Sequence, residues 1–342
     1  MIPLYQAIGK IVLTKENFNS LPEKDKKLFI VKQYCDELDK FTSKKDGVGR
    51  LLEINLDTNK KECYFSQGTE LSPDKKDELL VFTNNAPNDP SIYAAHISLK
   101  PLLQFELYQY VNNNFKNISW TDLTRGEDFL RFLKEIQETF YRVENKIISL
   151  RYDKLKAEQQ KDFPDPENIP ELKNNLNNQS KYNKEFQKCL KKYLSSTLKE
   201  YVTKRQAYAL KIDGKFLHQG EYADCYIDVL YYYLFEKHYL ENTKQGYCHI
   251  CGQDSTLPKD ISIKQKFFGT TNPLYFDKVD KSITHNAFSM CEKCNQQVLI
   301  GIQYASTKLR TTLLGLQTIV LPEINFEADN SEELIDPQKL IM

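Results

Sequence analysis

Four cysteines of this chain stand in two C-x2-C pairs, a spacing that favours metal binding. Cys248 and Cys251 form the first pair, and Cys291 and Cys294 form the second. The chain has eight cysteines in 342 residues, a frequency at which about 0.2 such pairs would arise by chance. Two thiolates three residues apart on a tight turn can occupy adjacent corners of a tetrahedron about 2.3 Å from a zinc ion. The spacing therefore predicts one zinc ion held by all four thiolates.

A site with four thiolate ligands has no open position for a water molecule or a substrate. Catalytic zinc usually keeps three protein ligands, so the pattern predicts a structural zinc rather than a hydrolytic one. Two disulfides or a redox dithiol are weaker alternatives, because a redox C-x-x-C is expected alone in a thioredoxin-like setting. Gly252 is expected to turn the chain away from the first pair, and His249 and His285 are interpreted as loop residues.

A nuclease remains an alternative, because the cysteine spacing also resembles the His-Asn-His homing-type endonucleases. Those enzymes carry an Asn five residues before the second pair, the place that Asn286 occupies here. Their chemistry needs a general-base histidine beside an acidic metal ligand, and His285 is the only histidine between Cys251 and Asn286. The chain also lacks a phosphate-binding G-x-x-x-x-G-K-S/T loop, a G-x-G-x-x-G motif and a G-x-S-x-G motif. We therefore expect no enzymatic activity.

Charge and hydropathy give no global attraction to nucleic acid or to a membrane. The 47 Lys and Arg residues balance the 47 Asp and Glu residues, so any electrostatic function must be local. The sequence has no apolar run of about 18 residues and no signal sequence at its start, which predicts a cytoplasmic protein without a membrane partner. The other cysteines are scattered, as buried cytosolic thiols usually are.

The remaining elements of the chain indicate an α+β protein. Residues 50–83 alternate in a β pattern that points Leu52, Ile54 and Leu56 inward and the intervening polar residues outward. This predicts an antiparallel β patch. A heptad-like apolar pattern over 129–150 predicts one long helix, and similar periods predict a buried helix over 221–242 and another from Val298 to Leu316.

Composition suggests five segments along the chain. These are an α+β domain (1–150), a linker or mobile excursion (151–185), a basic helical segment (186–245), a zinc module with a following helix (246–316), and an acidic tail or connection to a helical C-terminal part (317–342). Residues 186–215 hold eight Lys or Arg against two acids, interleaved with tyrosines. This pattern fits either a solvated helix face or a strip that contacts phosphates. Its candidate nucleic-acid contacts are Lys204, Arg205 and Lys211.

The insert between the two cysteine pairs contains a second group of candidate contacts. Lys264 and Lys266 precede Phe267 and Phe268, so the rings can anchor in the core while the ammonium groups stay in water. Short donors of the kind that reach phosphates or groove edges follow them. These donors are Thr270, Thr271 and Asn272. The alternative is that the lysines lie on a solvated loop.

The cysteine-rich segment, about residues 245–310, resembles the zinc-containing large subunit of type I-B CRISPR Cascade complexes. The resemblance rests on a C-x-x-C-G pair, a K-F-F stretch followed by two threonines, and a C-E-x-C pair that continues into a helix. Here these elements are Cys248, Cys251 and Gly252, then Lys266, Phe267, Phe268, Thr270 and Thr271, then Cys291, Glu292 and Cys294, with Gly301 and Tyr304 after them. Gly269 and the Asn272-Pro273 pair depart from the family pattern. The helical C-terminal part of such subunits is missing, so the chain is expected to be a fragment, an ordered portion, or a subunit completed by another chain.

The resemblance implies a non-catalytic subunit of an RNA-guided DNA surveillance complex. Such a subunit helps to hold the 5′ end of the crRNA and inspects target double-stranded DNA for the short motif beside the target, while base pairing reads the rest. The implied partners are the crRNA, the target DNA, and the backbone and small subunits of Cascade. A further alternative is a protein-interaction module that the zinc only braces.

Overall fold

The computed structural model divides the chain into two compact units. Unit 1 comprises Met1–Tyr34 and Tyr231–Met342, and unit 2 comprises Cys35–Leu230, so unit 2 is inserted into the sequence of unit 1. The structure describes residues 2–43, 47–82, 92–96, 103–144, 147–161, 163–165, 169–175, 177–198, 207–241, 243–258, 288–313, 316–319 and 321.

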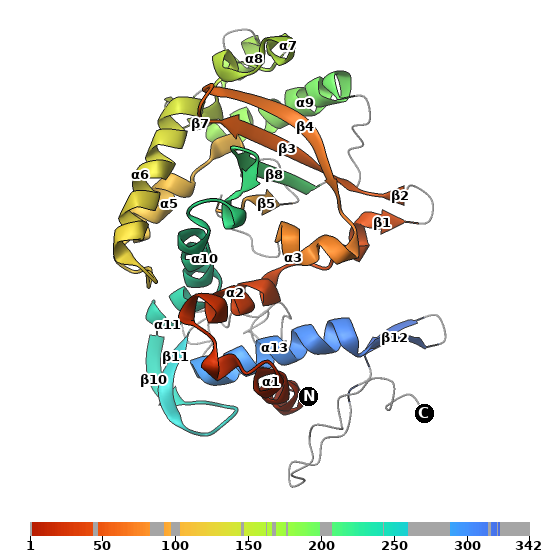
Figure 1. Cartoon of the computed structure of the whole chain (residues 1–342), viewed down its shortest axis with the longest axis vertical. Coiled ribbons are helices and arrows are strands. Elements are labelled where there is room, and N and C mark those ends of the chain that lie inside the picture. The colour runs from red at the N-terminus through yellow and green to blue at the C-terminus, as the bar shows by residue number, and fades with distance from the viewer. Residues whose placement is uncertain are drawn as a thin grey trace. The chain divides into compact units, whose positions relative to one another are not determined.

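Unit 1 is built on two helices from opposite ends of the sequence and a β-hairpin (Figure 1). Its described elements are α1 (Ile2–Lys15), a 3₁₀ turn (Phe18–Ser20), α2 (Glu23–Tyr34), a π-helical turn (Tyr232–Glu236), α11 (Lys237–Leu240), β10 (Thr243–Tyr247), β11 (Asp254–Pro258), α13 (Glu292–Lys308), β12 (Arg310–Leu313) and β13 (Leu316–Ile319). α1, the β10–β11 hairpin and α13 share one apolar core, to which Ile8, Leu257 and Val298 contribute. Residues more than 280 positions apart are therefore packed together.

Two glycines allow α1 and α13 to approach at backbone distance. A Cβ atom added at Gly9 would lie 1.8 Å from the carbonyl oxygen of Gln297, and one added at Gly301 would lie 1.8 Å from the carbonyl oxygen of Tyr5. Glycine in a helix interior costs about 1 kcal/mol relative to alanine. Here that cost permits a contact that no larger residue could make without moving a helix.

Unit 2 contains a mixed sheet in the order β4-β3-β8-β5, with β9 paired to β8 (Figure 1). β3 (Arg50–Asp57) and β4 (Glu62–Glu70) are antiparallel, as predicted, whereas β3 and β8 (Ala207–Ile212) are parallel. The shorter strands are β5 (Ala95–His96), β9 (Lys215–Phe216), and the pairs β1 (Thr42–Ser43) with β2 (Gly47–Val48) and β6 (Tyr141–Glu144) with β7 (Ile147–Leu150). The helices of unit 2 are α3 (Lys76–Leu79), α5 (Leu107–Asn114), α6 (Leu123–Phe140), α7 (Ala157–Gln160), α8 (Pro170–Asn174), α9 (Gln179–Thr197) and α10 (Ala223–Tyr231, whose last residue belongs to unit 1). The mixture of helices and small sheets confirms the α+β class.

The predicted inward and outward faces of β3 are only half correct. Leu52, Ile54 and Leu56 are buried as predicted, but Glu53 and Asn55 on the opposite face are 5% and 6% exposed. β3 is a central strand, and the polar side chains on its second face are paired: the Asn55 amide donates to Ser66 Oγ at 2.8 Å. The alternating pattern predicted a strand with one solvent-exposed face, which is wrong for this central strand. The parallel pairing with β8 was not predicted from the sequence.

The long helix predicted over 129–150 ends at Phe140. α6 begins after the N-cap Asp122, whose carboxylate accepts a hydrogen bond from Arg125 N at 3.1 Å. The chain then forms the β6–β7 hairpin, in which Val143 pairs with Ile148. Val143 is 56% exposed, so its place in the apolar heptad pattern was coincidental. The alternation of apolar and polar residues in Tyr141–Glu144 was the signal for a strand.

Two other segments differ from the predictions: 151–185 has more secondary structure than a linker, and 186–245 contains strands as well as helices. In the predicted linker 151–185, short helices form, and Leu155, Phe163 and Leu172 are buried. The segment 186–245, predicted to be helical, includes most of α9 but also the central strand β8. The predicted helix over 221–242 is observed as α10, the π-helical turn and α11, whereas the one predicted to reach Leu316 ends at Lys308. Among the described helices, none is both long and apolar enough to cross a membrane.

Candidate metal centre

The β10–β11 hairpin presents the first cysteine pair. Cys248 follows β10 directly, and Cys248 N donates to the carbonyl oxygen of Gln253 at 2.9 Å, which closes the turn. Gly252 N donates back to the carbonyl oxygen of Cys248 at 2.8 Å, and Gly252 has a φ of 69°. This left-handed conformation suits glycine, so the predicted role of Gly252 in turning the chain is confirmed.

The second cysteine pair lies at the N-terminal end of α13. Cys291 is the N-cap residue of this helix and Cys294 lies in its first turn. Residues just before the helix fasten this pair to the first one: His249 N donates to the carbonyl oxygen of Ser289 at 3.1 Å, and Ser289 N donates to His249 Nδ1 at 3.0 Å. His249, interpreted as a loop residue, therefore links the two cysteine pairs.

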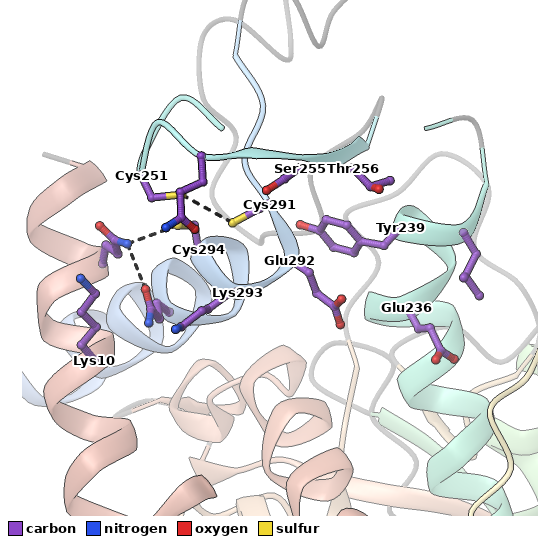
Figure 2. Close-up of a pocket in the computed structure, with 14 residues that line it drawn as sticks. Lys10, Glu236, Tyr239, Cys251, Ser255, Thr256, Cys291, Glu292, Lys293 and Cys294 are labelled. Carbon is purple, nitrogen blue, oxygen red and sulfur yellow. Dashed lines mark hydrogen bonds between the residues drawn. The ribbon is translucent and has the colours of Figure 1, made fainter. Parts of the chain in front are cut away.

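The four thiols converge on one point. Their Sγ atoms all lie within 4.8 Å of one another, and Cys251 Sγ lies 3.9 Å from Cys291 Sγ. Two sulfurs at adjacent corners of a tetrahedral zinc site with bonds of about 2.3 Å would be separated by about 3.8 Å. Figure 2 shows Cys251 facing Cys291 and Cys294 above the start of α13. The arrangement fits a four-coordinate metal ion, which these cysteines could hold.

The protein surroundings disfavour ionisation of Cys291 and Cys294, because burial raises the pKa of both thiols. Burial tends to raise the pKa of Cys248, but the backbone N–H groups of Cys251 and Cys291 lower this pKa to about 7. Burial and the neighbouring thiol of Cys291 raise the pKa of Cys294, and burial also raises the pKa of Cys291. A metal ion bound here would displace protons from Cys291 and Cys294, so its affinity would increase with pH.

A pocket of about 690 Å³ opens beside the four cysteines (Figure 2). Lys10 of α1 and Lys293 of α13 contribute positive charge to its lining, and Glu236 and Glu292 contribute negative charge. Because both signs of charge are present, charge alone does not select a strongly anionic or cationic ligand for this pocket.

In the part of the chain that the structure describes, none of the candidate nucleic-acid contacts lies beside the four cysteines. Most of these contacts lie outside the part of the chain that the structure describes, namely Lys264, Lys266, Thr270, Thr271 and Asn272 of the insert, and Lys204 and Arg205. His285 and Asn286 of the nuclease alternative also lie outside it. Lys211 lies on β8 in unit 2, where its Nζ is 2.7 Å from Glu53 Oε1 and its side chain is 17% exposed. Its charge is thus already balanced by a buried carboxylate.

Sequence reasoning missed one residue that touches the cysteine cluster. Gln6 of α1 donates a hydrogen bond from Nε2 to Cys294 Sγ at 3.3 Å. A single glutamine 288 positions from its partner leaves no spacing signal in the sequence. Only the packing of α1 against α13 reveals the contact.

One family model matches this chain. Residues 245–341, less than a third of the chain, match the central domain of CRISPR-associated protein TM1802. This match supports a CRISPR-associated protein. The matched segment contains both cysteine pairs and the whole of α13. Comparison with curated proteins gives no match. Comparison with solved structures gives none either.

Proposed function

We propose that this chain is the non-catalytic large subunit of a CRISPR RNA-guided DNA surveillance complex of type I-B, with a structural zinc. In this role it helps to hold the 5′ end of the crRNA and recognises the short motif beside the DNA target. Its partners are the crRNA, the target double-stranded DNA and the backbone and small subunits, in the cytoplasm. The observation that carries the proposal is the match of residues 245–341 to a CRISPR-associated central domain.

The geometry of the four cysteines supports a structural role for the metal. The four thiols would fill all four ligand positions of a tetrahedral ion, so no position would remain to activate water. Zinc is the ion proposed, because it accepts four thiolates in a tetrahedral arrangement and has no redox chemistry. Metal-dependent hydrolysis would need a different centre from this one.

The first test is whether the chain carries a guide RNA when it is made with its partners. Co-expressed with candidate backbone and small subunits, the chain is expected to co-purify with an RNA of uniform length. The same chain expressed alone is expected to carry no such RNA and to leave DNA and RNA intact when Mg²⁺ or Mn²⁺ is added. Gel analysis of the bound RNA and a cleavage assay with labelled duplexes measure both outcomes.

Two results would favour the alternatives. Cleavage by the purified chain that depends on a divalent cation and disappears in a His285→Ala variant would indicate the His-Asn-His-type endonuclease. Stable binding of the partner subunits without any RNA would instead indicate a zinc-braced interaction module.

A second prediction concerns the insert between the cysteine pairs. Changing Lys264→Ala together with Lys266→Ala is expected to weaken the binding of the assembled complex to target DNA or guide RNA. If each lysine contacts one phosphate, the slope of log K against log salt should fall by about 1.8, since each contact contributes about 0.9. Zinc content should stay unchanged. The measurement is a binding titration at several salt concentrations.

The matched control removes the same charge elsewhere. A Lys24→Ala, Lys60→Ala variant loses two exposed lysines outside the insert and should keep the original salt slope. An unaltered slope in the Lys264, Lys266 variant would remove the insert from the binding surface and leave Lys204 and Arg205 as the better candidates.

A further inference from the structure

The side chain of Gln6 lies between α1 and the cysteine cluster with two acceptors in hydrogen-bonding range. Its Nε2 atom is 3.3 Å from Cys294 Sγ and 3.0 Å from Gln297 Oε1. These two hydrogen bonds are drawn as dashed lines in Figure 2. Cys294 and Gln297 are only 3% and 6% exposed, so little water reaches these acceptors.

A hydrogen-bond donor at this position would stabilise a metal-bound thiolate. A cysteine whose proton has been displaced by a metal ion can only accept hydrogen bonds. A divalent ion with four thiolates has a net charge of about −2. Donors around the cluster offset that charge and orient the ligands. The backbone N–H of Cys291 is one such donor, and it donates to Cys248 Sγ at 3.3 Å. Gln6 supplies a comparable donor to Cys294 from a side chain.

The backbone of the two helices fixes this contact. Gly9 and Gly301 allow α1 and α13 to touch, and Gly9 lies one helical turn after Gln6. On α13, Gln297 lies one turn before Gly301, and its side chain holds the Gln6 amide from the other side. The donor is therefore positioned by packing as well as by its own rotamer.

We propose that Gln6 is a positioning residue of the metal centre, which makes the N-terminal helix part of that centre. Gln6 donates to the metal-bound Cys294 thiolate, lowers the charge density on this sulfur and slows loss of the metal. This residue lies outside the segment that matches the CRISPR-associated central domain. This role of Gln6 rests on the proposed metal at the four thiols, but not on any role of the chain with RNA.

Two substitutions of Gln6 separate donation to sulfur from simple bridging of the helices. Gln6→Leu removes both hydrogen bonds. Gln6→Glu keeps the shape and can still accept from the amide of Gln297, but its carboxylate cannot donate to a thiolate. Gln33→Leu is the matched control, since Gln33 lies in the same unit and donates to the carbonyl oxygen of Phe29 at 2.9 Å.

The measurements use the full chain loaded with zinc and, separately, with Co²⁺. Competition with a chelator gives the zinc affinity, and the near-ultraviolet absorption of the Co²⁺ form reports the sulfur-to-metal charge transfer. Loss of an outer hydrogen-bond partner typically lowers metal affinity by about 10- to 100-fold. We expect losses in this range for both variants, larger for Gln6→Glu, with a shift of the charge-transfer band to longer wavelength.

The outcomes decide the question. Wild-type affinity and spectrum in Gln6→Glu, with weakening only in Gln6→Leu, would mean that Gln6 merely bridges to Gln297 and would overturn the proposal. Losses no greater than those of Gln33→Leu would overturn it as well. If circular dichroism shows that Gln6→Leu is unfolded, the isosteric Gln6→Glu variant alone decides.

Discussion

Replacing Cys251 with serine is expected to remove the metal from the protein and to destabilise the part of unit 1 that the four thiols hold together. Cys251 is the exposed member of the quartet, so the substitution leaves the apolar core intact. Serine is a far weaker zinc ligand than a thiolate. Metal binding supplies on the order of 10 kcal/mol to small structural sites, and most of it should be lost.

The measurement combines elemental analysis with hydrogen exchange. Zinc is expected to fall from one ion per chain to nearly none, and the amides of β10, β11 and the start of α13 should lose protection. Cys189→Ser is the control, because Cys189 is a half-buried thiol of α9 outside the cluster, and this variant should keep its zinc. Freshly purified wild-type protein without zinc, prepared without chelators, would refute the assignment.

Replacing Gly9 with alanine is expected to separate α1 from α13. The new methyl group would lie 1.8 Å from the carbonyl oxygen of Gln297, a backbone atom that cannot rotate away. Overpacking usually costs about 1 to 3 kcal/mol, and a clash with helix backbone should reach the upper end or exceed it. Helix propensity would act in the opposite direction, since alanine is favoured by about 1 kcal/mol over glycine in a helix.

The expected result is a loss of hydrogen-exchange protection in residues 2–15 and a lower unfolding temperature of unit 1. Gly220→Ala is the control, because its added methyl group would find its nearest neighbour at 3.6 Å, an ordinary contact. A Gly9→Ala variant as stable as wild type, or more stable, would show that the two helices do not pack as described.

The cluster of four cysteines was predictable because its signal in the sequence is local. Each C-x2-C pair places two potential ligands on one turn, so the fold has only to bring two turns together. The four sulfurs do converge as the spacing predicted. The surroundings of the sulfurs were not predictable, because no motif records the contacts around them. Gln6 reaches Cys294 Sγ through the packing of α1 on α13, and Ser289 joins the two cysteine pairs through its hydrogen bond to His249.

In the fold too, contacts between neighbouring segments of the sequence were predictable, whereas contacts between distant segments were not. The β3–β4 hairpin was predicted because its strands are neighbours in sequence, whereas the parallel pairing of Leu51 with Ala207 joins residues from distant segments. The seven apolar residues of the predicted long helix fit a helical period even though the chain turns into β6 after Phe140. A helical period and an alternation of two coincide over a few residues, so the short hairpin was hidden.

The discontinuous sequence of unit 1 has a consequence for the synthesis of the chain. α1 is synthesised before α13, and Gly9 meets its partner Gly301 only after nearly 300 further residues have been added. At about 5 to 20 residues per second, this delay is about 15 to 60 s. During that time Tyr5 and Ile8, which are buried in the finished core, have no α13 to cover them. In the nascent chain, α1 is therefore a natural binding site for chaperones until translation has passed α13.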